Sequence, residues 1–342
     1  MNYKYLLVLL FLFFSSCIYN TTEKIKNTIK TIIAVENKFH YYENNDGYIV
    51  KKNSQTKKVV WKHQKLYQLS LKVLNSKNNI YYTTPNKVIS LDKMTGAINY
   101  TVKEDFTVTT DNLYIYKDEI IASSLYGVYS FSKSTGKIVW SLLPESSTIL
   151  TNSKILINKD TLYVSGKFKS NNKNTLYSYK LKDKSKLLEI NLPKTIITNI
   201  LQIQNNLIFG TGQSIVSREF FSINKNNFNI EWKLKQNIDF DSNIISNNDK
   251  GIFFKFKKKI LELDLKKLVV KEKYILPYNY FKILGVYNNE IITYNNSSLI
   301  TNSLSNNKIK VYKNIMTAGP WILNNEVYYV KDLSIKTFDN IH

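Results

Sequence analysis

The chain has 342 residues, and its 48 lysines and arginines against 26 aspartates and glutamates give a formal net charge of +22. So large a positive charge raises the possibility of nucleic-acid binding. However, Arg218 is the only arginine, and arginine makes most bidentate contacts to bases and phosphates. The lysines are spread along the whole chain, so we expect a solvated surface and no nucleic-acid partner.

Cysteine and histidine usage excludes further classes of site. Cys17 is the only cysteine, so the chain has no internal disulfide and no cysteine-ligated metal centre. His40, His63 and His342 are scattered and do not have the spacing of metal ligands. No Ser/His/Asp or paired-carboxylate pattern is specific enough to indicate catalysis. The sequence therefore predicts no catalytic residue, no metal and no cofactor.

The N-terminus has the pattern of a cleaved export signal. Lys4 supplies a positive charge, residues 5–14 form an apolar run, and Ser15 and Ser16 lead into Cys17. A charged start, a short apolar core and small residues at the exit are typical of a secretory signal. The run is too short for a transmembrane helix, which needs about 20 apolar residues. We therefore predict a signal peptide at residues 1–16.

Cys17 lies where a bacterial lipobox has the cysteine that becomes diacylated, although Phe14 replaces the usual leucine. A lone cysteine elsewhere would be interpreted as a small buried hydrophobe. Each buried CH₂ of an acyl chain contributes about 0.8 kcal/mol, so two or three chains hold a protein firmly to a membrane. Ile18 follows the cysteine where an aspartate would favour inner-membrane retention. We therefore expect lipidation at Cys17 and a location on the periplasmic face of the outer membrane.

An internal repeat follows the signal. Residues 90–100 and 130–140 match closely and begin about forty residues apart, a period typical of repeat architectures. Residues 222–232 have the same length and end in the same kind of aromatic residue. A fourth segment ends at Trp61 and keeps the threonine and the tryptophan, but not the glycine.

Each copy has the composition of a strand, a tight turn and a second strand. Asp92 closes the first strand as a turn cap, and Thr95-Gly96 and Thr135-Gly136 form the turns. Glycine adopts the positive φ that such a turn demands. The second strand ends in a large aromatic residue that we expect to fill the space between neighbouring sheets. These aromatic residues are Trp61, Tyr100, Trp140 and Trp232.

Two more β-rich runs precede each turn, such as residues 68–74 and 80–84 in one copy. Four short strands in about forty residues, without helical periodicity, are typical of a propeller blade. Degenerate copies cover residues 160–192, with Leu188 in place of the aromatic, and residues 251–276 and 290–312. The sequence therefore predicts an all-β fold, a single β-propeller of eight four-stranded blades, with seven blades as the alternative.

The last copy begins at Trp321 and ends before its fourth strand. A missing outer strand would leave an exposed sheet edge. We predict that the segment around residues 22–29 supplies this strand. Residues 17–30 then form the lipidated N-terminus and closing strand, and residues 31–342 form the propeller. No linker or shift in composition divides the chain, so we expect one domain.

The pattern Leu91-Asp92-x-x-Thr95-Gly96-x-Ile98-x-Tyr100 resembles the repeat of pyrroloquinoline-quinone-type propellers. Together with the lipoprotein signal, it makes the chain similar to the BamB family, the propeller lipoproteins of the outer-membrane β-barrel assembly machinery. This resemblance implies a non-enzymatic scaffold. Its expected partners are the barrel-inserting subunit of that machinery and unfolded outer-membrane proteins.

Two other functions remain open. A quinone-dependent dehydrogenase of this fold implies a calcium site, a catalytic carboxylate and often a disulfide between adjacent cysteines. This chain has no adjacent cysteines, and Asp92 and Asp264 recur at a turn position, so we expect no enzyme. A ligand-binding or adhesive surface propeller would carry exposed aromatics on one face. Tyr126, Tyr278 and Tyr280 are candidates that the sequence does not place.

Overall fold

The computed structural model describes residues 29–65, 73–84, 87–103, 108–124, 127–142, 151–167, 173–212, 218–236, 244–247, 250–278, 281–295, 298–313, 318–323, 326–331 and 334–338. The predicted signal peptide, Cys17 and the closing segment up to residue 28 lie outside the described residues. Tyr126, Tyr280 and His342 do as well. Within the described part of the chain, no helix is long and apolar enough to cross a membrane.

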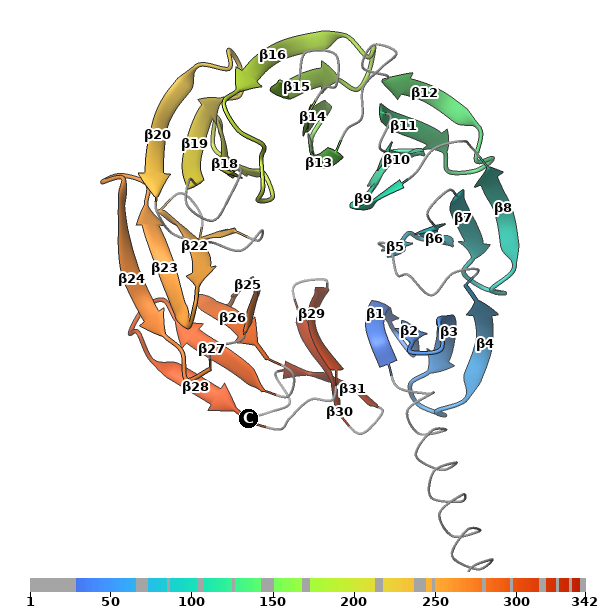
Figure 1. The fold of residues 1–342 in the computed structure, drawn as a ribbon. Helices are drawn as coiled ribbons and strands as arrows, with labels where there is room; N and C mark the ends of the chain where they lie inside the picture. Colours follow the sequence, from blue (N-terminus) through green and yellow to red (C-terminus); the bar gives the residue numbers. More distant parts are fainter. Residues whose placement is uncertain are drawn as a thin grey trace, which may run out of the picture.

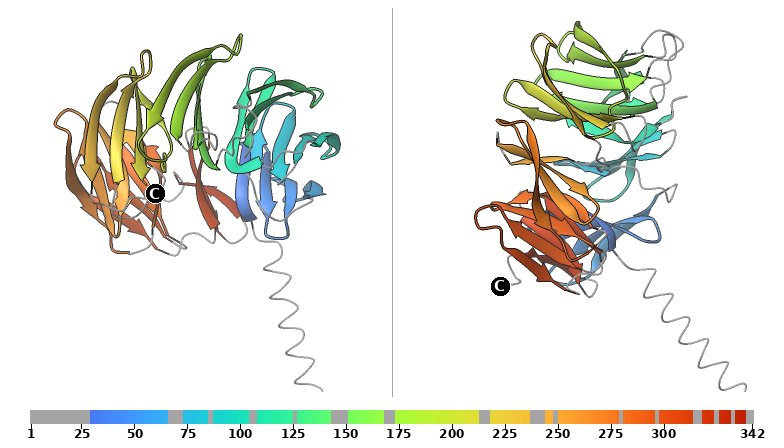
Figure 2. Two further views of the ribbon diagram at one scale, coloured as in Figure 1. Left: turned by 45° about the horizontal axis from the view of Figure 1, so that its top comes forward. Right: turned by 60° about the vertical axis from the view of Figure 1, so that its left-hand side comes forward.

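Eight antiparallel β-sheets stand around a central axis and form an eight-bladed propeller (Figure 1). The strands of each sheet pair in chain order, with the first strand nearest the axis and the last at the circumference. Seven sheets have four strands, and the eighth has three among the described residues. The views in Figure 2 show the twist of the blades, which the right-handed twist of each strand produces. The predicted all-β fold and the count of eight blades are confirmed.

Blades 1 to 4 contain the first sixteen strands. Blades 1 and 2 consist of β1 (Ile29–Glu36), β2 (Phe39–Asn44), β3 (Tyr48–Asn53), β4 (Val59–Gln64), β5 (Val73–Asn75), β6 (Asn79–Thr84), β7 (Lys87–Asp92) and β8 (Ile98–Lys103). Blades 3 and 4 consist of β9 (Val108–Tyr116), β10 (Glu119–Ser124), β11 (Gly127–Ser132), β12 (Ile138–Leu142), β13 (Thr151–Asn158), β14 (Thr161–Lys167), β15 (Asn174–Lys180) and β16 (Lys186–Leu192).

Blades 5 to 8 contain the remaining strands. Blades 5 and 6 consist of β17 (Leu201–Ile203), β18 (Asn206–Gly212), β19 (Arg218–Asn224), β20 (Ile230–Gln236), β21 (Ile245–Asn247), β22 (Gly251–Phe256), β23 (Lys259–Asp264) and β24 (Val269–Ile275). Blades 7 and 8 consist of β25 (Lys282–Tyr287), β26 (Glu290–Tyr294), β27 (Leu299–Ser303), β28 (Ile309–Tyr312), β29 (Ala318–Leu323), β30 (Glu326–Lys331) and β31 (Ser334–Thr337).

The core lies in the seams between blades. A cluster of buried apolar side chains fills each of the eight seams. The middle strands are covered on both faces, so β6 is buried over most of its length instead of alternating. The outer strand β16 is mostly exposed or half-buried, because one edge of the blade faces solvent. Burial therefore alternates in β16 and does not alternate in β6.

The ring closes where blade 8 meets blade 1. Ile32 and Tyr42 of blade 1 pack in one buried cluster with Tyr328 and Val330 of blade 8. Figure 1 shows β1 and β29 side by side at this seam. β1 begins at Ile29, slightly earlier than the predicted start of the propeller at residue 31. The described residues therefore close the ring by side-chain packing.

Candidate functional site

One face of the propeller is built from two connections of each blade, those between the first and second strands and those between the third and fourth strands. We call it the turn face. A backbone hydrogen bond joins the two connections within a blade: Lys93 N–H donates to the Asn78 carbonyl, and Lys133 N–H to the Asp118 carbonyl, both at 2.9 Å. The same bond recurs in seven blades. It places the two connections next to each other all around the ring.

The turn between the third and fourth strands of blade 2 is capped by Asp92. Its Oδ1 accepts hydrogen bonds from the backbone N–H of Thr95 at 2.7 Å and of Met94 at 2.9 Å, and from the Thr95 hydroxyl at 2.9 Å. These bonds, led by the one from the Thr95 backbone, lower the pKa of Asp92. Gly96 N–H donates to the Asp92 carbonyl at 2.8 Å, and Gly96 has a φ of 76°.

The corresponding turn of blade 3 has the same shape with a serine cap. The Ser132 carbonyl accepts a hydrogen bond from Gly136 N–H at 2.9 Å, and Gly136 has a φ of 72°. Thr135 N–H donates to the Ser132 hydroxyl at 3.3 Å, and the Thr135 hydroxyl accepts from Lys137 N–H at 3.3 Å. Asp92, Thr95, Gly96, Thr135 and Gly136 therefore lie in two equivalent turns.

The left-handed conformation of this turn is kept in blades that lack the glycine. The residues at this position and their φ angles are Lys57 (61°), Gly96 (76°), Gly136 (72°), Lys184 (64°), Phe228 (57°), Leu268 (54°) and Asn307 (57°). A residue with a side chain pays about 1–2 kcal/mol for this conformation. The copies that the sequence pattern treats as degenerate are therefore intact in their backbone.

The aromatic residue at the end of one blade packs on the turn of the next blade. A Cβ at Gly96 would lie 2.7 Å from the ring of Trp61, closer than atoms tolerate. The Trp61 indole N–H also donates to the Lys93 carbonyl at 3.3 Å. A side chain at Gly136 would likewise collide with the ring of Tyr100. The glycines therefore provide room for a neighbouring ring as well as a positive φ.

The other three aromatic residues also lie in seams. The Tyr100 hydroxyl donates to the Lys133 carbonyl of blade 3 at 3.1 Å. Trp140 packs against the cluster between blades 3 and 4, and the Lys184 ammonium lies 4.7 Å from its ring centroid. Trp232 packs against the cluster between blades 5 and 6. Together with Trp61, these residues join each blade to the next at four of the eight seams.

The turn face is rich in lysine. Its described connections contain Lys38, Lys57, Lys58, Lys77, Lys93, Lys117, Lys133, Lys137, Lys159, Lys182, Lys184, Lys225, Lys250, Lys266, Lys267 and Lys308, against the acidic residues Asp118, Asp160 and Asp183. These lysines are scattered in the sequence, but the fold gathers them, because each repeat returns to the same face. A face with this excess of one charge attracts anionic partners. The recurrence of lysine after the cap, at Lys93, Lys133 and Lys225, was the signal in the sequence.

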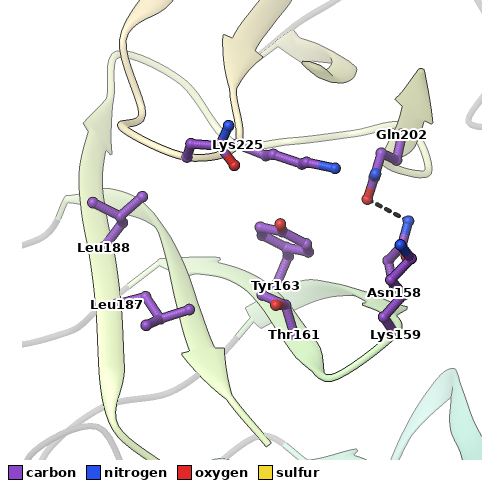
Figure 3. A pocket seen from close by; sticks show the side chains of 9 residues that line it. Asn158, Lys159, Thr161, Tyr163, Leu187, Leu188, Gln202 and Lys225 are labelled. Carbon is purple, nitrogen blue, oxygen red and sulfur yellow. Dashed lines mark hydrogen bonds between the residues drawn. The ribbon is translucent and has the colours of Figure 1, made fainter. Parts of the chain in front are cut away.

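A cavity of about 340 Å³ lies in the seam between blades 4 and 5 and reaches the turn face. Figure 3 shows Leu187 and Leu188 on one side, Tyr163 in the middle, and Lys225 extending across from the neighbouring blade. Its lining residues are Asn158, Lys159, Thr161, Tyr163, Leu187, Leu188, Gln202, Lys225 and Asn226. A second cavity of about 420 Å³ lies on blade 1 and is lined by Tyr42, Asn44, Asp46, Tyr48, Val50, Val59, Val60, Trp61 and Lys62.

The carboxylates and histidines considered for catalysis or metal binding do not converge. Asp264 caps its own turn through Lys266 N–H at 3.0 Å and Lys267 N–H at 3.1 Å, as Asp92 does in another blade. A hydrogen bond of 3.1 Å joins His63 Nε2 to the Tyr82 hydroxyl. Throughout the described ranges, no three His, Cys, Asp or Glu side chains gather as a possible metal site.

Comparison with known proteins gives a likeness in fold. No protein-family model matches the sequence, and no curated protein matches it. BamB from Moraxella catarrhalis superposes with a TM-score of 0.67 at 10% identity, over 91% of this chain and 96% of that chain. A computationally designed protein, Ika8, gives a TM-score of 0.67 at 11% identity, over 91% and 96% of the two chains. The dihydro-heme d1 dehydrogenase NirN gives 0.59 at 11% identity, over 83% of this chain and 66% of that chain.

Proposed function

We propose that this protein is a non-enzymatic scaffold lipoprotein that assists the assembly and insertion of outer-membrane β-barrel proteins. It binds the barrel-inserting subunit of the assembly machinery and is anchored through Cys17 to the periplasmic face of the outer membrane. The observation that carries the proposal is the agreement in fold with BamB over nearly the whole of both chains. The export and lipidation pattern at residues 1–17 adds an independent reason.

The turn face is the best candidate for the contact with the partner. Connections on a rigid scaffold are where binding residues usually lie. The lysines of this face complement an acidic surface, and such complementarity speeds association and weakens as salt rises. The hydrogen-bonded turns hold the backbone under these lysines in the same position in seven blades. The partner would thus meet a preformed surface.

A pull-down tests the proposed binding. Purified mature protein is incubated with the immobilised periplasmic region of the barrel-inserting subunit from the same cell, at low and at physiological salt. We expect retention that decreases as salt rises. The double variant Lys266→Glu/Lys267→Glu on the turn face should bind less. The matched control is Lys233→Glu/Lys235→Glu, since both lysines are exposed on the outer strand β20. If both variants bind as the wild type does, or if both lose binding, the turn face is not the contact.

Anchoring is tested separately by metabolic labelling with a palmitate analogue. We expect label on the wild type, no label on Cys17→Ala, and release of the variant from the membrane. An unlabelled wild type would rule out the lipoprotein. This test does not depend on the partner.

The likeness in fold to NirN is the observation that favours an enzyme as the second candidate. A dye-linked dehydrogenase assay with added quinone and calcium decides between the two. Turnover without retention by the barrel-inserting subunit would favour the enzyme, and retention without turnover favours the scaffold. If neither occurs, a ligand-binding surface propeller is the best remaining function.

A further inference from the structure

We propose that the cavity between blades 4 and 5 is a binding site for an amphiphilic carboxylate, an apolar group of about one ring in size that carries a carboxylate. The site is independent of the proposed scaffold function. The same chemistry occurs in a free arylalkyl acid and in an acidic side chain next to an apolar side chain in a peptide.

The cavity exists because this seam lacks the aromatic residue found in others. Leu188 pairs with Ser178 in the register at which Trp61, Tyr100, Trp140 and Trp232 stand in their blades. A leucine is smaller than a tryptophan and has no hydrogen-bond donor. Phe228 of the blade 5 turn is buried in the same cluster, but space remains beside Leu187 and Leu188.

A tyrosine hydroxyl that is paired in the seam between blades 2 and 3 has no partner among the described residues of this seam. In blade 2 the hydroxyl of Tyr81 donates to the Lys133 carbonyl in the next turn at 3.4 Å. Tyr163 occupies the same position in blade 4, since both pair with the serine opposite the seam residue. Tyr163 is only 3% exposed and lines the cavity, yet its hydroxyl has no partner among the described residues. Burial raises the pKa of Tyr163, so the hydroxyl remains a donor.

The charges around the cavity select a negative ligand. Lys159 and Lys225 line it, and no lining residue is acidic. Lys225 Nζ donates to the Gln204 carbonyl at 3.3 Å and keeps donors for a ligand. Asp160 and Glu189, which adjoin lining residues in sequence, are already paired with Lys117 at 3.0 Å and Lys186 at 2.9 Å. A carboxylate here would meet two ammonium groups and the Tyr163 hydroxyl.

The remaining walls fit the apolar part of the ligand and fix its size. Leu187 and Leu188 of β16 form the apolar wall, and Leu187 is 46% exposed. Opposite it, the amides of Asn158 and Gln202 bond to each other and form a polar wall (Figure 3). Ligand pockets measure about 300–1,000 Å³, so a cavity of about 340 Å³ suits a small ligand.

The test uses 4-phenylbutyrate as the probe and 4-phenylbutan-1-ol as its neutral match, with binding to the mature protein followed by ligand-observed NMR. We expect the acid to bind roughly tenfold more tightly than the alcohol, with a millimolar or lower dissociation constant. Lys159→Gln/Lys225→Gln should reduce the affinity for the acid to that for the alcohol. Lys57→Gln/Lys58→Gln, exposed on the same face in the blade 1 turn, should leave both affinities unchanged.

Filling the cavity provides the second arm. Leu188→Trp restores the ring of the other seams and should abolish binding of acid and alcohol. Leu188→Phe serves the same purpose if the tryptophan variant does not fold, as judged by its melting curve. Equal affinity of the wild type for acid and alcohol, no binding of the acid at millimolar concentration, or unchanged binding after filling would each overturn the site.

A pair of peptides identifies the source of the carboxylate. Acetyl-Ala-Phe-Asp-amide is compared with acetyl-Ala-Phe-Asn-amide in the same measurement. Tighter binding of the aspartate peptide than of 4-phenylbutyrate supports a site for a protein segment, and the reverse order supports a site for a free acid. Either order requires that filling the cavity removes the binding.

Discussion

Residues in the left-handed region cost free energy unless they are glycines, and five of the described turns between third and fourth strands contain such a residue. In some of these turns the side chain makes contacts that offset the cost. Phe228 is buried in the seam between blades 4 and 5, and Lys184 lies over the ring of Trp140. Glycine is required only where a large ring of the preceding blade presses on the turn, as at Gly96 and Gly136.

Exchanging residues at this position tests the distinction. Gly96→Ala should lower the free energy of unfolding by about 2–4 kcal/mol, because strain and the collision with Trp61 add. Lys57→Gly should leave stability unchanged or slightly raise it, since Lys57 is exposed and only strain is removed. Urea unfolding measures both. Equal losses in the two variants would show that the ring contact does not matter.

Asp92 gives the turn a dependence on pH. The folded pKa of Asp92 is lowered from an unfolded value of about 3.9, so its stabilisation is present above that value and is lost as pH falls through the folded pKa. Asn53 caps the blade 1 turn through its Oδ1 at 2.9 Å, so Asp92→Asn should keep the turn. The wild type should be the more stable protein at pH 7, and the difference in unfolding free energy should shrink towards pH 3. A constant difference would contradict this cause.

At the scale of strands, four of the eight blades are attached to the next by an outer-strand aromatic residue. Trp61 is 9% exposed, packs with Tyr41, Leu91 and their neighbours, and bonds to the Lys93 carbonyl. Trp61→Ala should therefore cost about 3–5 kcal/mol of unfolding free energy. Tyr100→Phe keeps the ring and loses one hydroxyl bond, so about 1 kcal/mol is expected. Thermal and urea unfolding of the two variants should rank them in this order.

The blades could be predicted from the sequence because each repeat of strand, turn and aromatic residue is formed by residues close together in the chain. Residues 90–100 and 130–140 placed two turns with Tyr100 and Trp140, and residues 222–232 and the segment ending at Trp61 added the other two seam aromatics. The five turns without glycine were recognised as copies of the repeat, but their left-handed conformation was not predicted, because backbone hydrogen bonds and side-chain caps hold this conformation with many residue types.

The cavity and the turn face could not be predicted in the same way. The cavity depends on how Tyr163 and Leu188 of one blade face Lys225 of the next, which local spacing does not reveal. The lysines of the turn face are far apart in sequence and become neighbours only after the ring has formed. The sequence showed that Leu188 departs from the repeat. It did not show that a cavity lies beside Leu188, because that depends on how blades 4 and 5 pack together.

At the scale of the whole molecule, stability depends on the closed ring. Blade 8 packs on blade 1 through Tyr328 and Val330, and β31 (Ser334–Thr337) is the last strand of its sheet among the described residues. The sequence predicts that the segment around residues 22–29 pairs with this sheet as a fourth strand, although Ile29 itself belongs to β1. An unpaired edge would leave backbone hydrogen-bonding groups without partners.

Removing this segment tests the closure. Deletion of residues 22–28, with β1 left intact, should lower the melting temperature of the entire propeller in one transition. A variant with a Gly-Ser sequence of equal length in their place controls for chain length and should be destabilised similarly. Unchanged melting of both proteins would show that packing of blade 8 on blade 1 closes the ring without a strand from the N-terminus.

The central claim is that an anchored propeller serves as a scaffold in barrel assembly. Co-purification from detergent-solubilised membranes, with partners identified by mass spectrometry, tests it most directly. The account predicts that the barrel-inserting subunit is enriched with the wild type and is depleted when Cys17→Ala releases the protein from the membrane. Recovery of a labelled, membrane-bound wild type without that subunit would contradict it.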